Sequence, residues 1–79
     1  MQIYKNLSGV EGIEGYEVGG DYIMVKFTDP SNSGYHTYKY SNTSAGAENV
    51  AEMKRLAEAG DGLTDFIRMN VRKLYEERS

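Results

Sequence analysis

Few residues in this chain have the type and spacing that catalysis requires. His36 is the only histidine, and no serine or threonine stands at a spacing that makes it a nucleophile for this imidazole. Glu48 and Glu52 share a helix face at a separation of four, but Arg55 follows Glu52 by three positions and favours a solvated, charge-paired surface. We therefore expect a protein that is not an enzyme, with no catalytic residue.

Metal and cofactor binding have as little support. The chain has no cysteine and one histidine, which leaves carboxylates as the remaining strong ligands. Asp21 and Asp29 stand in expected turns and are not part of an Asp-x-Asp-x-Asp loop of the calcium-binding type. The glycine-rich stretch 9–20 lacks Gly-Lys-Ser/Thr and Gly-x-Gly-x-x-Gly, so plain turns are expected there. We expect no metal and no cofactor.

Aromatic and basic side chains alternate along two segments that read as strands. Stretches 22–27 and 35–40 each place alternate residues on opposite faces. If the helices cover the more apolar face, the open face carries Tyr22, Met24, Lys26, Tyr35, Thr37 and Lys39. Tyrosine rings stack on bases and lysines contact phosphates, so this face is a candidate site for single-stranded RNA. The alternative is an ordinary half-exposed sheet, where both residue types are common.

A second basic group lies near the end of the chain. Arg68 and Arg72 are four positions apart, and Lys73 follows directly. Like charges at that spacing cost a few tenths of a kcal/mol, which hints at a role in contacting phosphates. The same side chains can instead pair with Asp65 and Glu76 on one helix surface.

The elements that would position these residues are three strands and two helices. Strands are expected at 16–18, 22–27 and 35–40, with a turn at 19–21 and a hairpin loop at 28–34. The loop does not fix the register, and a slip of one residue would exchange the two faces.

The polar stretch 41–46 supplies N-cap candidates, Ser44 among them, and the period becomes helical from Ala47. The first helix has an apolar stripe of Val50, Met53, Leu56 and Ala57, and Gly60 ends it. A second helix is expected from Leu63 to Glu76. These patterns predict an α+β fold: a three-stranded antiparallel β-meander followed by an αα-hairpin packed on one sheet face.

At 79 residues there is room for one domain, expected over 16–76, with a leader at 1–15 that is partly ordered at best and a tail at 77–79. No segment resembles a signal peptide or a membrane span, so a cytoplasmic protein without membrane contact is expected. The net charge of −3 opposes indiscriminate attraction to nucleic acid.

The stretch 16–75 resembles the KTSC domain, a small module named for the C-terminus of some lysyl-tRNA synthetases and also found as stand-alone bacterial proteins. The matching pieces are Ile23-x-Val25-x-Phe27, Tyr38-Lys39-Tyr40, Ala59-Gly60 and Phe66-Ile67-Arg68. The chain departs from the pattern in its longer loop at 29–34 and in lacking a proline after Tyr40. The resemblance implies a bacterial module whose suggested role is RNA binding.

Two interpretations follow. The first is a binding module for single-stranded RNA or tRNA that uses Tyr22, Lys26, Tyr35, Lys39, Arg68 and Arg72. The second is a protein-interaction module whose partner covers the open sheet face or an edge strand at Tyr16–Val18.

Overall fold

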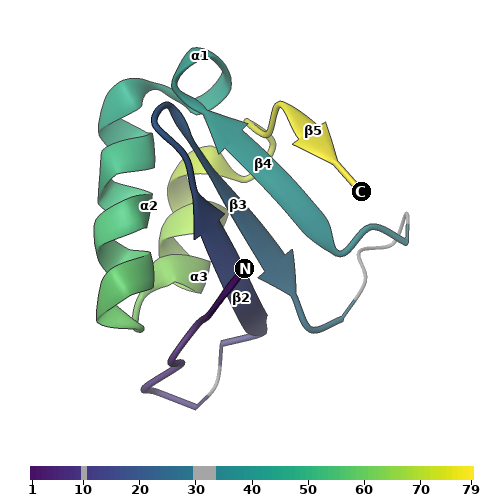
Figure 1. Cartoon of the computed structure of the whole chain (residues 1–79), viewed down its shortest axis with the longest axis vertical. Coiled ribbons are helices and arrows are strands. Elements are labelled where there is room, and N and C mark those ends of the chain that lie inside the picture. The colour runs from purple at the N-terminus through teal and green to yellow at the C-terminus, as the bar shows by residue number, and fades with distance from the viewer. Residues whose placement is uncertain (10, 30–33) are drawn as a thin grey trace.

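The computed structural model describes residues 1–9, 11–29 and 34–79, and it contains one antiparallel sheet with helices on one side (Figure 1). Each strand pairs with the next along the chain, in the order β1 (Gln2–Ile3), β2 (Ile13–Val18), β3 (Tyr22–Phe27), β4 (Thr37–Ser41) and β5 (Glu77–Arg78). The helices are α1 (Asn42–Ala45), α2 (Ala47–Ala59), α3 (Leu63–Phe66) and a π-helical turn η1 (Ile67–Val71). The α+β class and the antiparallel sheet are confirmed, but the sheet has five strands where three were expected.

The first additional strand comes from residues 1–15, which were expected to be a leader outside the domain. β1 pairs with β2, and Tyr4 is buried in the core at 3% exposure. A Cβ atom on Gly15 would lie 2.6 Å from the Gln2 carbonyl oxygen, so the close approach of β1 depends on this glycine. The described part of the segment therefore belongs to the fold, and the expectation of a loose leader is wrong.

The second additional strand comes from the expected tail. The helix expected at 63–76 ends at Val71, and the chain turns back to pair with β4. The backbone N–H of Glu76 donates to the Lys39 carbonyl at 2.7 Å, and that of Ser79 donates to the Thr37 carbonyl at 2.8 Å. These bonds satisfy the outer edge of β4, which a three-stranded sheet would have left open.

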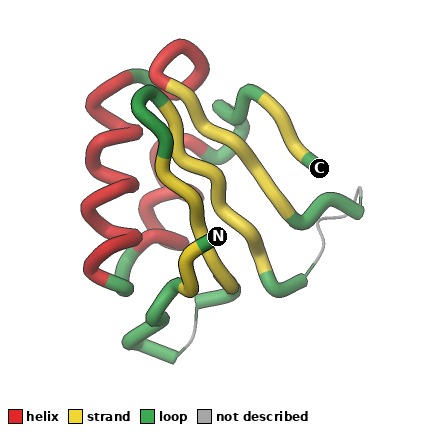
Figure 2. Tube along the Cα trace, viewed as in Figure 1, coloured by secondary structure: helices red, strands yellow, loops and turns green. Residues whose placement is uncertain are grey.

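The helices (red in Figure 2) lie to one side of the strands (yellow). The register places the apolar residues of the strands on the face under these helices. Ile23 lies opposite Tyr40, and Val25 lies opposite Tyr38. Ile23, Val25 and Tyr40 are buried with residues of the helices, namely Val50, Met53, Ala57, Leu63, Ile67 and Val71. The helices therefore cover the more apolar face of the strands, which the alternation alone had left open. Tyr35 precedes β4 and does not belong to that face.

The first expected helix begins at Ala47, where α2 begins, but its N-cap is Gly46 and not Ser44. Ser41, within the same polar stretch, is the N-cap of the short and unexpected α1, in a capping box with Ser44. Gly60 ends α2 in a left-handed conformation at φ 78°, as its place after the apolar stripe predicts. The expected hairpin loop falls partly on residues 30–33, which lie outside the described residues. No helix in the described ranges is long and apolar enough to cross a membrane.

Candidate functional site

The open sheet face brings together three of the six expected site residues: Tyr22, Lys26 and Lys39. Both lysines have carboxylate partners, because Lys26 lies 3.0 Å from Glu14 and Lys39 lies 3.5 Å from Glu76. Much of the positive charge that would attract phosphates is therefore compensated on the protein itself.

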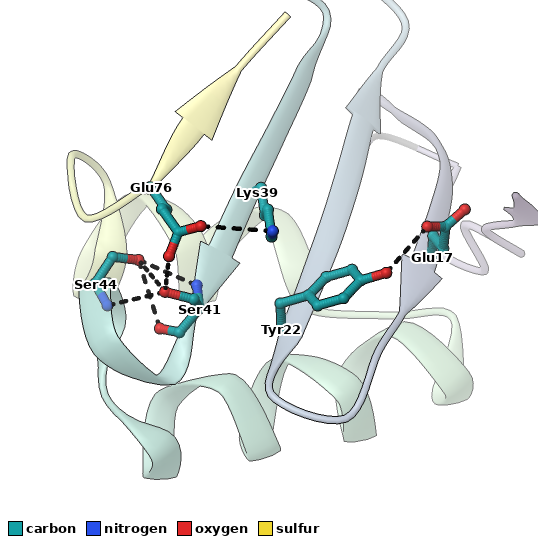
Figure 3. A network of polar contacts seen from close by, with 6 residues as sticks. All are labelled: Glu17, Tyr22, Lys39, Ser41, Ser44 and Glu76. Atoms are coloured by element: carbon teal, nitrogen blue, oxygen red, sulfur yellow. Dashed lines mark hydrogen bonds and ion pairs between the residues drawn. The ribbon is translucent and has the colours of Figure 1, made fainter.

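The contacts around Lys39 form a polar network at this face (Figure 3). Glu76 accepts a 2.7 Å hydrogen bond from the Ser41 hydroxyl, and this bond, together with Lys39, lowers the pKa of the Glu76 carboxyl. The Lys39 ammonium also lies 4.7 Å from the centre of the Tyr22 ring, while the Tyr22 hydroxyl donates to Glu17 at 3.3 Å. Tyr22 and Lys39 thus already contact other residues of the chain, and the Tyr22 ring is not an unoccupied stacking surface.

Tyr35 and Arg72 lie elsewhere, on an aromatic groove of about 430 Å³ between the sheet and the end of η1. We call this site the aromatic groove, and it is lined by Gly12, Phe27, Thr28, Asp29, Tyr35, Tyr38, Tyr40, Ile67, Arg72, Lys73 and Tyr75. The volume falls within the range of small-ligand sites. β3 and β4 contribute rings from the covered face, and the segment after η1 contributes the basic residues.

The rings of the aromatic groove are fixed by contacts with one another. Phe27 and Tyr38 meet edge to face with centroids 5.6 Å apart, and Tyr38 meets Tyr75 in the same way at 5.1 Å. From β5, the Arg78 guanidinium lies 4.5 Å from the Tyr35 ring centre and 5.2 Å from that of Tyr75. These contacts order large apolar surfaces before any ligand arrives.

Two cations that flank the aromatic groove have no carboxylate partner among the described residues. Arg72 and Lys73 are exposed, and neither forms an ion pair within the described parts of the chain. Asp29 is the one carboxylate among the lining residues. Unlike the sheet face, the groove therefore combines rings with uncompensated positive charge. This arrangement suits a planar ring that carries an anionic group.

Arg68 is separate from both surfaces. Its guanidinium pairs with Asp65 at 2.6 Å, and the two side chains line a different hollow together with Glu11 and Asp61. The six expected residues thus divide into three on the sheet face, two at the aromatic groove and one beside Asp65.

Sequence reasoning missed most of the groove because its rings lie on the core side of the sheet. Tyr38 and Tyr40 are not among the residues expected on the open face, and Tyr75 falls within the helix expected from Leu63 to Glu76. A signal was present, since tyrosines on a core face carry hydroxyls that need polar surroundings. The return of the chain at Val71, which places Tyr75 beside Tyr38, had no such signal.

His36 makes a contact with the backbone. Its Nδ1 lies 3.3 Å from the Phe27 carbonyl oxygen. Within 1–9, 11–29 and 34–79, no three His, Asp or Glu side chains gather in an arrangement that could hold a metal ion.

Comparison of the chain with models of protein families, with curated proteins and with solved structures found no match. The resemblance to the KTSC domain therefore stays a prediction from the motifs.

Proposed function

We propose that this chain is a small binding module, not an enzyme, and that it binds single-stranded RNA by holding an unstacked base in the aromatic groove. The observation that carries the proposal is the contrast between the two sets of cations. Lys26 and Lys39 have carboxylate partners, whereas Arg72 and Lys73 stand unpaired, among the described residues, beside five aromatic rings.

The physical chemistry of single-strand binding supports this location. Base stacking on an aromatic side chain contributes about 1–3 kcal/mol per base and tolerates any sequence. Arg72 and Lys73 are adjacent to the rings, so they are placed to contact the phosphates that flank a bound base. With a net charge of −3, affinity has to come from this local patch and not from the overall field.

The test compares two double variants that each remove two positive charges. Arg72→Gln/Lys73→Gln alters the aromatic groove, and Lys26→Gln/Lys39→Gln alters the sheet face. Binding of a fluorescently labelled mixed-sequence RNA octamer is followed by anisotropy at several salt concentrations. We expect the groove variant to lose at least about tenfold in affinity and to reduce the salt slope by about 1.4. The sheet-face variant should bind within about twofold of the unaltered chain, since exposed compensated ion pairs contribute little.

An amide chemical-shift titration with the same RNA locates the contact independently. Shifts that cluster around Phe27, Tyr38 and the segment 72–75 support the groove. Shifts confined to 22–26 would return the site to the sheet face, and no shift at millimolar RNA would refute RNA binding altogether.

A second candidate is a protein partner on the open sheet face. Ile3 is 84% exposed and lies on this face, because it pairs with Gly15, which in turn pairs with Lys26. Met1 is also exposed at this edge. An apolar edge beside compensated charges suits a protein surface better than a phosphate backbone. The edge strand first considered for such a partner, Tyr16–Val18, is covered at Tyr16 by β1.

A further inference from the structure

Three buried tyrosines differ in what their hydroxyl groups contact. The Tyr4 hydroxyl donates to Glu11 at 2.6 Å, and the Tyr16 hydroxyl donates to Gln2 at 3.1 Å. Tyr40 is the most buried of the three at 1% exposure, yet its hydroxyl forms no hydrogen bond with any residue that the structure describes. Among the described residues, Oγ1 of Thr64 is the fully buried side-chain polar atom without a partner, so the Tyr40 hydroxyl is not sealed in the core and reaches the open space of the aromatic groove.

The position of Tyr40 indicates what its hydroxyl would contact when a ligand is bound. Among the buried tyrosines Tyr4, Tyr16 and Tyr40, only Tyr40 lines the aromatic groove. Burial, and then the neighbouring Tyr38 and Tyr75, raise the pKa of Tyr40 above its ordinary value. The hydroxyl therefore keeps its proton at every pH at which the protein is expected to work, and it can act as a hydrogen-bond donor.

We propose that Tyr40 determines which ligands enter the aromatic groove, by donating a hydrogen bond from its hydroxyl to an acceptor on the edge of the bound ring. The surrounding rings provide stacking surface but discriminate weakly between planar groups. A donor that a bound ring covers discriminates strongly, because a ring without an acceptor would take the hydroxyl away from water and leave it unpaired. On the proposed function, on which this inference rests, the acceptor is a carbonyl oxygen or ring nitrogen of the base.

The experiment compares Tyr40→Phe with Tyr16→Phe as a matched control. Each removes one hydroxyl from a buried tyrosine, but the Tyr16 hydroxyl has its partner, Gln2, within the protein. Without RNA, we expect Tyr16→Phe to lower the urea midpoint of unfolding, and Tyr40→Phe to leave it unchanged or to raise it. With the RNA octamer, we expect the opposite order: Tyr40→Phe loses about fivefold in affinity, and Tyr16→Phe binds like the unaltered chain.

A second probe assigns the lost hydrogen bond to the base. An octamer with abasic sites keeps the phosphates but presents no ring edge, so the unaltered chain and Tyr40→Phe should bind it equally. If the unaltered chain binds the octamer and Tyr40→Phe binds it equally well, the role of Tyr40 is overturned and the proposed function stays intact. No octamer binding by the unaltered chain would overturn both.

Discussion

Oε1 of Glu11 accepts a 2.7 Å hydrogen bond from the backbone N–H of Thr64, 53 positions further along the chain. Its Oε2 accepts from the N–H of Gly62 at 3.1 Å and from the hydroxyl of Tyr4 at 2.6 Å. The first turn of α3 is thus capped by a carboxylate from the N-terminal segment, because the residue at its own N-cap, Gly62, has no side chain. One side chain joins the start of the chain to the second helix.

Replacing Glu11 tests whether this cap stabilises the fold. We expect Glu11→Ala to lower the free energy of unfolding by about 2 kcal/mol, because it leaves two helix N–H groups and a buried hydroxyl without their acceptor. Glu14→Gln is the matched control, since it removes an exposed carboxylate whose pair with Lys26 should contribute less than about 0.5 kcal/mol. Urea unfolding measures the stability of both variants, and equal losses in the free energy of unfolding would contradict the capping role of Glu11.

The same carboxylate makes stability depend on pH. Burial alone would raise the pKa of Glu11, but the hydrogen bonds from Tyr4, Thr64 and Gly62 together lower it below the ordinary value. Its contribution is therefore fully present above the ordinary pKa, about 4.3, and is lost as pH falls through the lower folded-state pKa. Glu52 and Glu76 also have lowered pKa values, so part of the acid dependence belongs to them.

The measurement is the urea midpoint between pH 7 and pH 2.5, for the unaltered chain and for Glu11→Gln. The two midpoints should differ most at neutral pH and converge in acid. A constant difference between the two midpoints across this pH range would show that ionisation of Glu11 does not contribute to the pH dependence of stability.

Gly15 tests the attachment of β1. An added Cβ would lie 2.6 Å from the backbone oxygen of Gln2, which can move only if β1 moves. We expect Gly15→Ala to cost about 1–3 kcal/mol and to speed amide hydrogen exchange at Tyr4, whose N–H donates to the Glu14 carbonyl. Gly20→Ala is the control, because nothing lies within 4 Å of its Cβ position. If Gly15→Ala and Gly20→Ala show the same amide hydrogen exchange at Tyr4 and the same free energy of unfolding, the attachment of β1 does not depend on Gly15.

Arg78 tests the preorganisation of the aromatic groove. Its guanidinium contacts the rings of Tyr35 and Tyr75, so Arg78→Ala should shift the ring resonances of both tyrosines in the protein without RNA. If the rings hold a base, affinity should fall about threefold, the value of one exposed cation–π contact. Arg68→Ala, which removes an exposed arginine paired with Asp65, should leave the ring resonances and the affinity unchanged.

The salt dependence separates positioning from phosphate contact. Arg78→Ala should bind RNA with the same salt slope as the unaltered chain. If Arg78 instead contacted a phosphate, its removal would lower the slope by about 0.7. A lowered slope would contradict the positioning role.

Local patterns in the sequence determined the middle of this fold. Alternation over 22–27 defined β3 to the residue, and the apolar stripe from Val50 with Gly60 behind it defined the end of α2. The same alternation separated the residues of the two sheet faces, but it left open which face the helices cover. These features depend on neighbours within a few positions, so the chain itself carries the information.

Tertiary structure decided the two ends of the chain and the candidate site. Residues 2–3 and 77–78 are too short to show a period, and they form strands only because β2 and β4 offer unpaired backbone edges. The return of the chain after Val71 places Tyr75 against Tyr38 and leaves Arg72 and Lys73 at the aromatic groove. Lys26 pairs with Glu14 of β2, and Lys39 pairs with Glu76, which directly precedes β5. The pairing of charges and the grouping of rings in the groove depend on residues that the fold brings together from distant positions in the chain. A pattern read along the sequence does not contain the distances between them.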